Sequence, residues 1–142
     1  MKERTFAIIK PDGMKHKDEV LRRIEKSGLK IIKSNITMFD ASKAAQFYIH
    51  VKKKNELVYQ SLIKYMTSGE IMPMILEGDN AAARLRAITG FTDPEKAEKG
   101  TIRGDLGIDK MRIADSESRS TKNIIHSSGS MEEAEKEMKF FF

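Results

Sequence analysis

A chain of 142 residues is long enough for one domain spanning residues 1–142, since a fold of this size buries about 70% of the surface that its unfolded chain exposes. The composition, 39% apolar and 33% charged with only three prolines, is typical of a globular protein and excludes a disordered one. The sequence has no cysteine, which excludes disulfides and thiolate metal sites, and its net charge of +5 favours anionic partners.

The amino-terminal part of the chain predicts a strand, a helix and a second strand. The apolar run over residues 5–10 predicts a buried strand, which the Pro-Asp-Gly sequence after it ends with a turn. Asp18 is placed to cap a helix with apolar residues at helical spacing, and Gly28 to end that helix. An isoleucine-rich stretch over residues 29–39 then predicts a second strand.

Two helices, a strand and a third helix are predicted in the middle of the chain. Helical patterns cover residues 42–50 and 56–66, and the sequence IMPMILEG that follows predicts a strand. Because Pro73 in this strand cannot donate a ladder hydrogen bond, we expect it at a sheet edge or beside a bulge. Asn80 is expected to cap the helix AAARLRAIT that follows it.

The last part of the chain begins with a long irregular connection, residues 91–122, and connections of this length are more often functional than idle. Residues 123–128, NIIHSS, predict the final strand, and Ser130 with Glu133 forms the capping box that opens a final helix. The order of elements predicts an α+β fold of the ferredoxin-like type, a four-stranded antiparallel sheet with helices covering one face. The inward stripe of the final helix consists of Met131, Ala134, Met138 and Phe141.

His126 is the first candidate for chemistry. If residues 123–128 are extended, His126 shares one face of the strand with Ile124 and Ser128. A catalytic histidine needs one ring nitrogen held while the other presents a lone pair, and Glu137, at the margin of the inward stripe, could hold it. From this pair alone, a buried structural histidine beside an ordinary surface glutamate is the simpler interpretation.

Basic residues near predicted strand ends and loops are candidate phosphate ligands. Lys10 ends the first strand, and Arg103 lies in the glycine-rich sequence KGTIRGD, where a guanidinium can grip phosphate through two donors. Arg84 and Arg86 are about 200° apart on their helix, so at most one of them faces a shared site. Thr92, in a turn, could donate to a phosphate oxygen or to its own backbone. Each of these residues alone is also explained as solvated surface.

Several other functions are not supported by the sequence. Walker A, dinucleotide-binding, zinc-protease and nucleophile-elbow motifs are all missing. With 7% aromatic residues and no RNP-like run, a nucleic-acid partner is not expected. The apolar run at the amino terminus is too short for a signal sequence or a membrane span, so we expect a cytoplasmic protein without a membrane partner.

Six segments occur together in one order: RTFAIIKPDG, YMTSG, LEG, TDPEKAEKGTIRGD, NIIH and AEKEM. In this combination the chain resembles the nucleoside diphosphate kinases over nearly its whole length. The resemblance implies ping-pong transfer of the γ-phosphate of a nucleoside triphosphate such as ATP to a nucleoside diphosphate through a phosphohistidine. It also implies Mg2+, held mainly by nucleotide phosphates and water, and a homo-oligomer, either a hexamer or a tetramer built from dimers.

The resemblance further implies a role for each matched residue. His126 corresponds to the phosphorylated histidine, Glu137 to the carboxylate that holds its other ring nitrogen, and Ser128 to a residue assisting this pair. Lys10 resembles the lysine that contacts the transferred phosphoryl group and the ribose, and Asn123 resembles the ligand of the ribose hydroxyls. The remaining matches are Tyr48, which helps position the phosphoryl group, and the phosphate ligands Arg86, Thr92 and Arg103.

The chain departs from the family pattern in three places. The phenylalanine that clamps the nucleotide base is replaced at or next to Val58, with Tyr59 alongside. Ser127 and Gly129 stand where a glycine and an aspartate are common after the histidine. Residues 106–122 form an insertion relative to the commonest members. A non-catalytic nucleotide- or nucleic-acid-binding module of the same fold and a phosphohistidine phosphatase are the alternative functions.

Overall fold

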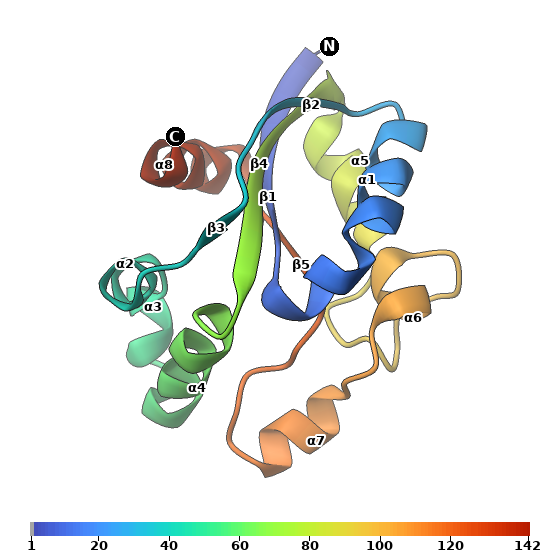
Figure 1. The fold of residues 1–142 in the computed structure, drawn as a ribbon. Helices are drawn as coiled ribbons and strands as arrows, with labels where there is room; N and C mark the ends of the chain where they lie inside the picture. The colour runs from blue at the N-terminus through green and yellow to red at the C-terminus, as the bar shows by residue number, and fades with distance from the viewer. Residues whose placement is uncertain (1) are drawn as a thin grey trace.

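The computed structural model describes residues 2–142 and contains one antiparallel sheet (Figure 1). Its order across the sheet is β2-β4-β1-β5, and β3 pairs with β4 next to β2. This arrangement puts β1 and β4 in the middle of the sheet. The strands are β1 (Lys2–Ile9), β2 (Lys30–Ser34), β3 (Thr37–Met38), β4 (Glu70–Asp79) and β5 (Ile125–Ser127).

Helices cover both faces of the sheet, with α1, α5 and α6 on one side and α2, α3, α4 and α8 on the other (Figure 1). The α+β ferredoxin-like class is therefore confirmed, while the expectation that helices cover only one face is wrong. The helices are η1 (Pro11–His16, a 3₁₀-helix), α1 (Lys17–Lys26), α2 (Ala41–Phe47), α3 (Ile49–Lys52), α4 (Glu56–Met66), α5 (Ala81–Thr89), α6 (Ile102–Leu106), α7 (Met111–Ser116) and α8 (Met131–Phe141).

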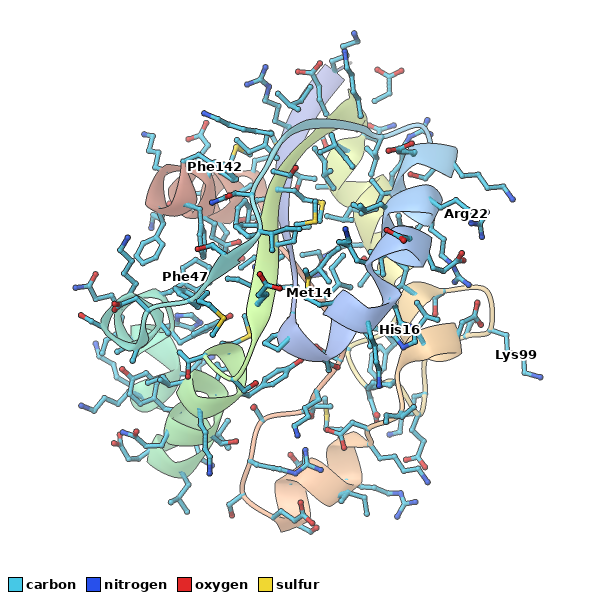
Figure 2. The ribbon with its side chains drawn as sticks, viewed as in Figure 1. Met14, His16, Arg22, Phe47, Lys99 and Phe142 are labelled. Atoms are coloured by element: carbon cyan, nitrogen blue, oxygen red, sulfur yellow. The ribbon has the colours of Figure 1, made fainter. Side chains whose placement is uncertain are left out.

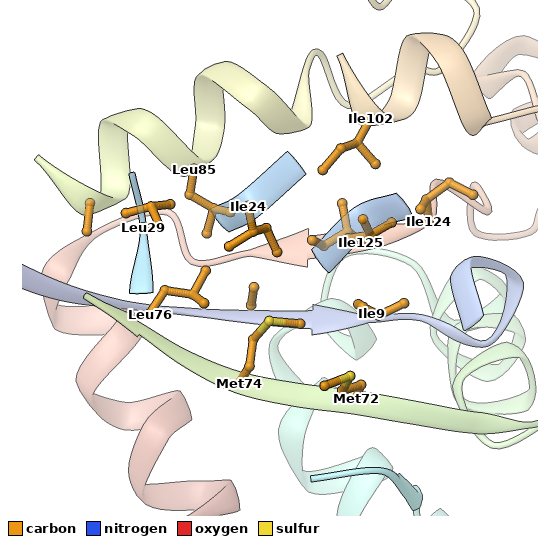
Figure 3. Packing of buried hydrophobic residues seen from close by; sticks show 13 residues of the cluster. Ile9, Ile24, Leu29, Met72, Met74, Leu76, Leu85, Ile102, Ile124 and Ile125 are labelled. Carbon is orange, nitrogen blue, oxygen red and sulfur yellow. The ribbon is translucent and has the colours of Figure 1, made fainter. Parts of the chain in front are cut away.

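Two hydrophobic clusters, one on each face, explain why both faces are covered. In β1, Ala7 and Ile9 belong to the first cluster and Phe6 and Ile8 to the second, because alternate side chains of a strand point to opposite faces. Phe47 lies on the side of the second cluster and Met14 on the other side of the sheet (Figure 2). The first cluster also contains Val20, Ile24, Leu29, Met72, Met74, Leu76, Ala81, Leu85, Ile102, Ile124 and Ile125 (Figure 3).

Pro73 lies in the central strand β4, opposite Ile8 of β1, so of the two predicted alternatives the sheet edge is wrong; the ladder of β4 with β2 does carry an irregularity, between Ile31 and Lys33. On its other side Pro73 faces the break between β2 and β3, where the N–H of Asn35 donates to the Pro73 carbonyl at 3.2 Å. Because the N and O atoms of a strand residue point to the same neighbour, the missing N–H falls at this break, where the ladder is already interrupted.

The starts of two helices differ from their predicted caps. η1 runs directly into α1, which therefore begins at Lys17 with His16 at the N-cap, and Asp18 lies in the first turn instead of capping it. Asn80 does precede α5, but its φ is +51° and its side chain makes no capping bond. The carboxylate of Glu3 on β1 accepts a hydrogen bond from the N–H of Ala82 at 3.1 Å and takes over this role.

The irregular connection over residues 91–122 contains α6 and α7 and is tied together by aspartates. Asp109 accepts two hydrogen bonds from the guanidinium of Arg119, at 2.7 and 2.9 Å. Asp109 also accepts from the backbone N–H groups of Lys110 and Lys122. Asp93 accepts from the N–H of Met111 at 3.1 Å. The predicted insertion is therefore an ordered, hydrogen-bonded segment.

The strand β5 is shorter than predicted because Ile124 is not extended. Its φ is +74°, and only Ile125–Ser127 pair with β1. Ile124 consequently packs with Ile125 in the first cluster, and its predicted place beside His126 is wrong.

Only one of the two hydrogen bonds of the predicted capping box at the start of α8 is formed. The hydroxyl of Ser130 accepts from the N–H of Glu133 at 3.1 Å, whereas the Glu133 carboxylate accepts from the N–H of Gly129 instead of that of Ser130. Ala134 is buried as expected, but Met131 is 46% exposed, since the first residue of α8 lies beyond the second cluster. Met131 is therefore not part of the inward stripe.

Candidate active site

The candidate site lies where β1 and β5 run side by side, with His126 opposite Ile8 in the antiparallel register. β1 ends one residue before Lys10, and β5 follows directly after Asn123 and Ile124. The chain between α5 and α6 brings Thr92 to the same place. The central strand β1, buried on both faces, and the edge strand β5 paired to it thus set the position of the two chain segments that carry the site.

His126 is held by a carboxylate from α8. Its Nε2 lies 2.8 Å from Oε1 of Glu137, and the hydroxyl of Ser128 donates to the same oxygen at 2.6 Å. Burial alone would raise the pKa of Glu137, but the hydrogen bonds from His126 and Ser128 outweigh it and keep the pKa below its usual value. An ionised Glu137 accepts a proton-bearing Nε2, which leaves the lone pair on Nδ1.

Lys10 and Asn123 form a buried polar pair. The ammonium of Lys10 donates to Oδ1 of Asn123 at 2.7 Å, and the Asn123 amide donates to the Thr92 carbonyl at 3.0 Å. Burial, with a contribution from the positive charge of Arg103, lowers the pKa of Lys10 to about 8, although the negative charge of Asp12 opposes this change. Lys10 is therefore a cation at neutral pH that loses its proton more readily than an ordinary lysine.

Arg103 is anchored to the backbone on three sides. Its guanidinium donates to the carbonyls of Asn123, Gly90 and Ile125 at 3.1, 3.2 and 2.6 Å. Burial and the neighbouring charge of Arg86 lower the pKa of Arg103 to about 10, so the guanidinium stays charged at neutral pH. Three of its five N–H donors are used by these carbonyls, and two remain for a ligand.

Arg86 and Arg84 have different surroundings. Arg84 donates to the carbonyls of Asp79 and Ser27, at 2.7 and 2.8 Å, and is held at the other end of the helix. Arg86 is exposed and lines the same cavity as Arg103. Of the two arginines on α5, only Arg86 reaches the candidate site.

Two cavities flank Lys10 and His126. The first has a volume of about 520 Å³, and the second, between α2, α3 and α8, has a volume of about 500 Å³, both within the range of small-molecule sites. The first is lined by cationic and neutral polar groups together with His126, which suits an anionic ligand. Its lining residues are Lys10, Arg86, Gly90, Phe91, Thr92, Arg103, Asn123, His126 and Ser127.

The three predicted residues on α2 to α4 lie in different surroundings. Tyr48 lines the second cavity, and its buried hydroxyl has no hydrogen-bond partner among the described residues. Burial and the charge of Glu137 raise the pKa of Tyr48, so its phenol is neutral and can donate. Tyr59 is buried and donates to the Ala45 carbonyl at 2.9 Å, whereas Val58 is half-buried. Neither Val58 nor Tyr59 lines these two cavities.

Ile124, between Asn123 and His126, adopts a strained turn. With a φ of +74° and a 2.8 Å hydrogen bond from the N–H of Ile125 to the Asn123 carbonyl, it forms the rare γ-turn with positive φ. A β-branched residue in this conformation is strained by about 1–3 kcal/mol. Strain of this kind is retained where neighbouring groups enforce it.

Asp12 and Tyr65 belong to this site, although the residue patterns indicated no role for them. Asp12 accepts from the N–H of Ile124 at 3.1 Å and from the hydroxyl of Tyr65. From the local sequence, Asp12 is predicted only as a turn residue. The available signal was its position two residues after Lys10, and both residues also lie within the matched segments RTFAIIKPDG and YMTSG.

No group of three or more His, Asp or Glu side chains in residues 2–142 is placed to hold a metal ion. Within the same range, no helix is both long and apolar enough to cross a membrane.

A family model, curated relatives and solved structures that are similar to this chain all belong to one family. The family model described as nucleoside diphosphate kinase matches residues 3–142. The nucleoside diphosphate kinase of Sulfurisphaera tokodaii is 40% identical over 142 residues, covering 99% of this chain and 88% of that protein. The crystal structure of an NDP kinase from Pyrobaculum aerophilum is similar with a TM-score of 0.89 and 30% identity, covering 100% of this chain and 96% of that one.

A second solved structure carries a ligand. It is a transition-state mimic of the nucleoside-diphosphate kinase from Borrelia burgdorferi with bound vanadate and ADP. Its TM-score is 0.91 at 29% identity, and the match covers 99% of this chain and 87% of that one.

Proposed function

Since the chain belongs to the nucleoside diphosphate kinase family, we propose that His126 and the cationic cavity beside it are its active site. In this proposal the γ-phosphoryl group of ATP or another nucleoside triphosphate passes to Nδ1 of His126 and then to a nucleoside diphosphate. The observation that carries the proposal is the contact between Nε2 of His126 and Glu137, which leaves Nδ1 as the nucleophile. The vanadate and ADP bound by the Borrelia relative are ligands of the expected class.

The two half-reactions need no other base. The lone pair of Nδ1 attacks the γ-phosphorus, the bond to the β,γ-bridging oxygen breaks, and the nucleoside diphosphate leaves with the bonding electrons. Nε2 keeps its proton, and the positive charge that develops on the ring is stabilised by the Glu137 carboxylate. The second half is the reverse step with a different diphosphate.

Cationic side chains compensate the phosphate charge. Phosphoryl transfer depends mainly on alignment and charge stabilisation, and Lys10, Arg86 and Arg103 line the cavity for this purpose. Thr92 lies among them as a neutral donor. From the adjoining cavity Tyr48 contributes a hydroxyl that has no hydrogen-bond partner within residues 2–142, and the hydroxyl of Ser128 donates to Glu137.

The nucleoside is held by fewer groups than the phosphates. Asn123 is the proposed ligand of the ribose hydroxyls. Lys10, which donates a hydrogen bond to Asn123, is proposed to contact the same hydroxyls. Of the two residues matched to the base clamp, Val58 is half-buried and keeps part of its side chain exposed, whereas Tyr59 is packed into the second cluster. We therefore assign the base contact to Val58. A valine offers no ring for stacking and no polar group, so broad tolerance for the base is expected.

Magnesium enters with the nucleotide in this proposal. The polar groups that line the cavity are cationic or neutral and include no carboxylate, so the residues present fit an ion held by phosphate oxygens and water. When bound, the ion would neutralise part of the phosphate charge.

A homo-oligomer and a cytoplasmic location belong to the same proposal. Family resemblance supports the oligomer, which is either a hexamer or a tetramer and is built from dimers in both cases. The absence of cysteine from all 142 residues fits a reducing compartment.

Incubation with ATP labelled at the γ-phosphate tests the function. Acid-labile, alkali-stable label on the wild type that GDP removes as GTP is expected, and His126→Asn should take up none. His16→Asn is the matched control, because His16 lies outside both cavities and its side chain makes no capping bond. No label on the wild type would support a binding module, and release of free phosphate without GDP would support a phosphatase.

A further inference from the structure

The γ-turn at Ile124 is enforced from outside the segment that contains it. The N–H of Ile124 donates to Oδ2 of Asp12 at 3.1 Å, and its carbonyl accepts from the N–H of Lys10 at 2.8 Å. Both polar backbone groups of the strained residue are therefore bound by residues of one turn, Lys10 to Gly13.

Close approach of the two segments requires the glycine in that turn. A Cβ at Gly13 would lie 2.4 Å from the Ile124 carbonyl oxygen, well inside van der Waals contact. The backbone of residues 10–13 thus fits against the γ-turn without space for a side chain.

Tyr65 fixes the carboxylate that holds the turn. Its hydroxyl, on α4, donates to Oδ1 of Asp12, so each carboxylate oxygen has one partner. Tyr65 is only 6% exposed, and its ring also lies against the Lys10 ammonium, 5.8 Å from the centroid. In the described chain Asp12 makes no ion pair with Lys10, so its hydrogen-bonded contact to the segment that carries His126 is the one to Ile124, while its charge acts on Lys10 and Arg103 from a distance.

The turn sets the geometry of residues on both sides of it. Before it, the Asn123 side chain reaches Lys10, and the Asn123 carbonyl accepts from Arg103. After it, the Ile125 carbonyl accepts from the same guanidinium, and His126 follows. An Ile124 that relaxed to a negative φ would change the direction of the chain between Asn123 and His126.

We propose that Asp12 and Tyr65 are positioning residues for phosphoryl transfer. The Asp12 carboxylate, oriented by Tyr65, holds Ile124 at positive φ and so fixes Asn123, Lys10 and His126 relative to one another. This inference rests on the proposed function of His126.

A double-mutant cycle between Asp12 and Ile124 tests the inference. Asp12→Asn keeps the shape of the side chain but loses one of its two acceptors, and kcat should fall about 10-fold to 100-fold, as misplacement of about 1 Å does. Glycine reaches positive φ without strain, so Ile124→Gly removes the need for the carboxylate. In the Ile124→Gly background, Asp12→Asn should then lower kcat by less than about 3-fold.

The effect of Asp12→Asn on kcat is compared separately in the wild type and in Ile124→Gly, so any loss of activity caused by removing the Ile124 side chain cancels. All variants are assayed well below their melting temperatures. An equal loss of kcat on Asp12→Asn in both backgrounds would overturn the inference, while phosphohistidine formed by the wild type would leave the proposed function intact. Failure of the wild type to form phosphohistidine would refute the function itself.

Tyr65→Phe keeps the test decisive if Ile124→Gly does not fold. It removes only the hydroxyl, and kcat should fall several-fold with a small change in melting temperature. Thr89→Val is the matched control, because it removes a buried hydroxyl that donates to the Leu85 carbonyl at 2.6 Å, outside the γ-turn. It should lower the melting temperature similarly and leave kcat unchanged. Wild-type kcat in Tyr65→Phe would contradict the proposal.

Discussion

The ammonium of Lys10 and the side-chain oxygen of Asn123 are joined by a 2.7 Å hydrogen bond across 113 positions of the sequence. This pair connects the end of β1 to the segment that precedes β5. Because Lys10 is almost fully buried beside Arg103, its charge depends on pH within the range of ordinary assays.

Activity should therefore fall on the alkaline side. With a pKa of about 8 for Lys10, the charged fraction decreases as the pH rises through that value, and kcat/KM for ATP should decrease with it. Lys10→Arg keeps its charge throughout, so its alkaline limb should move to higher pH even if its maximum is lower. If kcat/KM falls at the same alkaline pH in the wild type and in Lys10→Arg, a group other than Lys10 is responsible for the decrease.

The two arginines of α5 provide a matched pair of substitutions. Arg86→Ala should lower kcat/KM by about 10-fold to 1,000-fold, the range expected for loss of a phosphate-stabilising cation. Arg84→Ala should leave kcat/KM unchanged, because Arg84 is bound to the Asp79 and Ser27 carbonyls away from the cavity. Steady-state kinetics with both variants measures the difference. Equal effects would show that the cavity is not where phosphates bind.

Glu137→Gln removes the charge that stabilises the histidine ring while keeping the size of the side chain. The rate of histidine phosphorylation, measured by rapid quench, should fall about 10-fold to 100-fold. Glu133→Gln, on the same helix, is the control, since its carboxylate accepts from the N–H of Gly129 and makes no bond to His126. A normal phosphorylation rate in Glu137→Gln would mean that this carboxylate is only structural.

Asp109 should stabilise the insertion in a pH-dependent way. Hydrogen bonds from Arg119, reinforced by the backbone N–H groups of Lys122 and Lys110, outweigh burial and lower the pKa of Asp109 to about 2. Since this pKa lies below the unfolded value, the stabilisation is complete above about pH 4 and is lost as the pH falls toward 2.

Asp109→Ala should lower the free energy of unfolding by about 1–3 kcal/mol at neutral pH, measured by urea denaturation. Asp115→Ala, at an exposed position in the same segment, is the control. The difference between Asp109→Ala and the wild type should shrink as the pH approaches 2. A constant difference would mean that the Asp109 charge is not what stabilises the segment.

The order of elements was predictable because it depends on local patterns. The apolar run over residues 5–10 predicts a buried strand and the period of residues 56–66 an amphipathic helix; the strand forms as β1, Lys2–Ile9, and the helix as α4, Glu56–Met66. Pro73 shows the limit of such reasoning. Its lack of an N–H predicts an interrupted ladder, but whether that interruption lies at a sheet edge or at a break between two partners depends on distant residues.

The residues of the candidate site could be predicted from the sequence, but the backbone geometry that links them could not. Strand alternation paired His126 with Ser128 correctly, and resemblance selected Arg86 over Arg84. The γ-turn at Ile124 could not be predicted from local preferences, since a β-branched residue rarely has positive φ. The groups that bind its backbone, the carboxylate of Asp12, 112 positions away, and the N–H of Lys10, are distant in sequence. Likewise, the capping of α5 by Glu3 depends on a strand that is distant in sequence.

The strand β1 gives alternate side chains to two separate hydrophobic clusters and ends immediately before the proposed phosphate-binding lysine. A substitution that changes the size of a buried side chain in either layer of helices should therefore shift the β1 backbone just before Lys10. Mutational tolerance should accordingly be lowest along this strand, and evolutionary drift in one layer should require compensating changes in the other to preserve the reacting geometry.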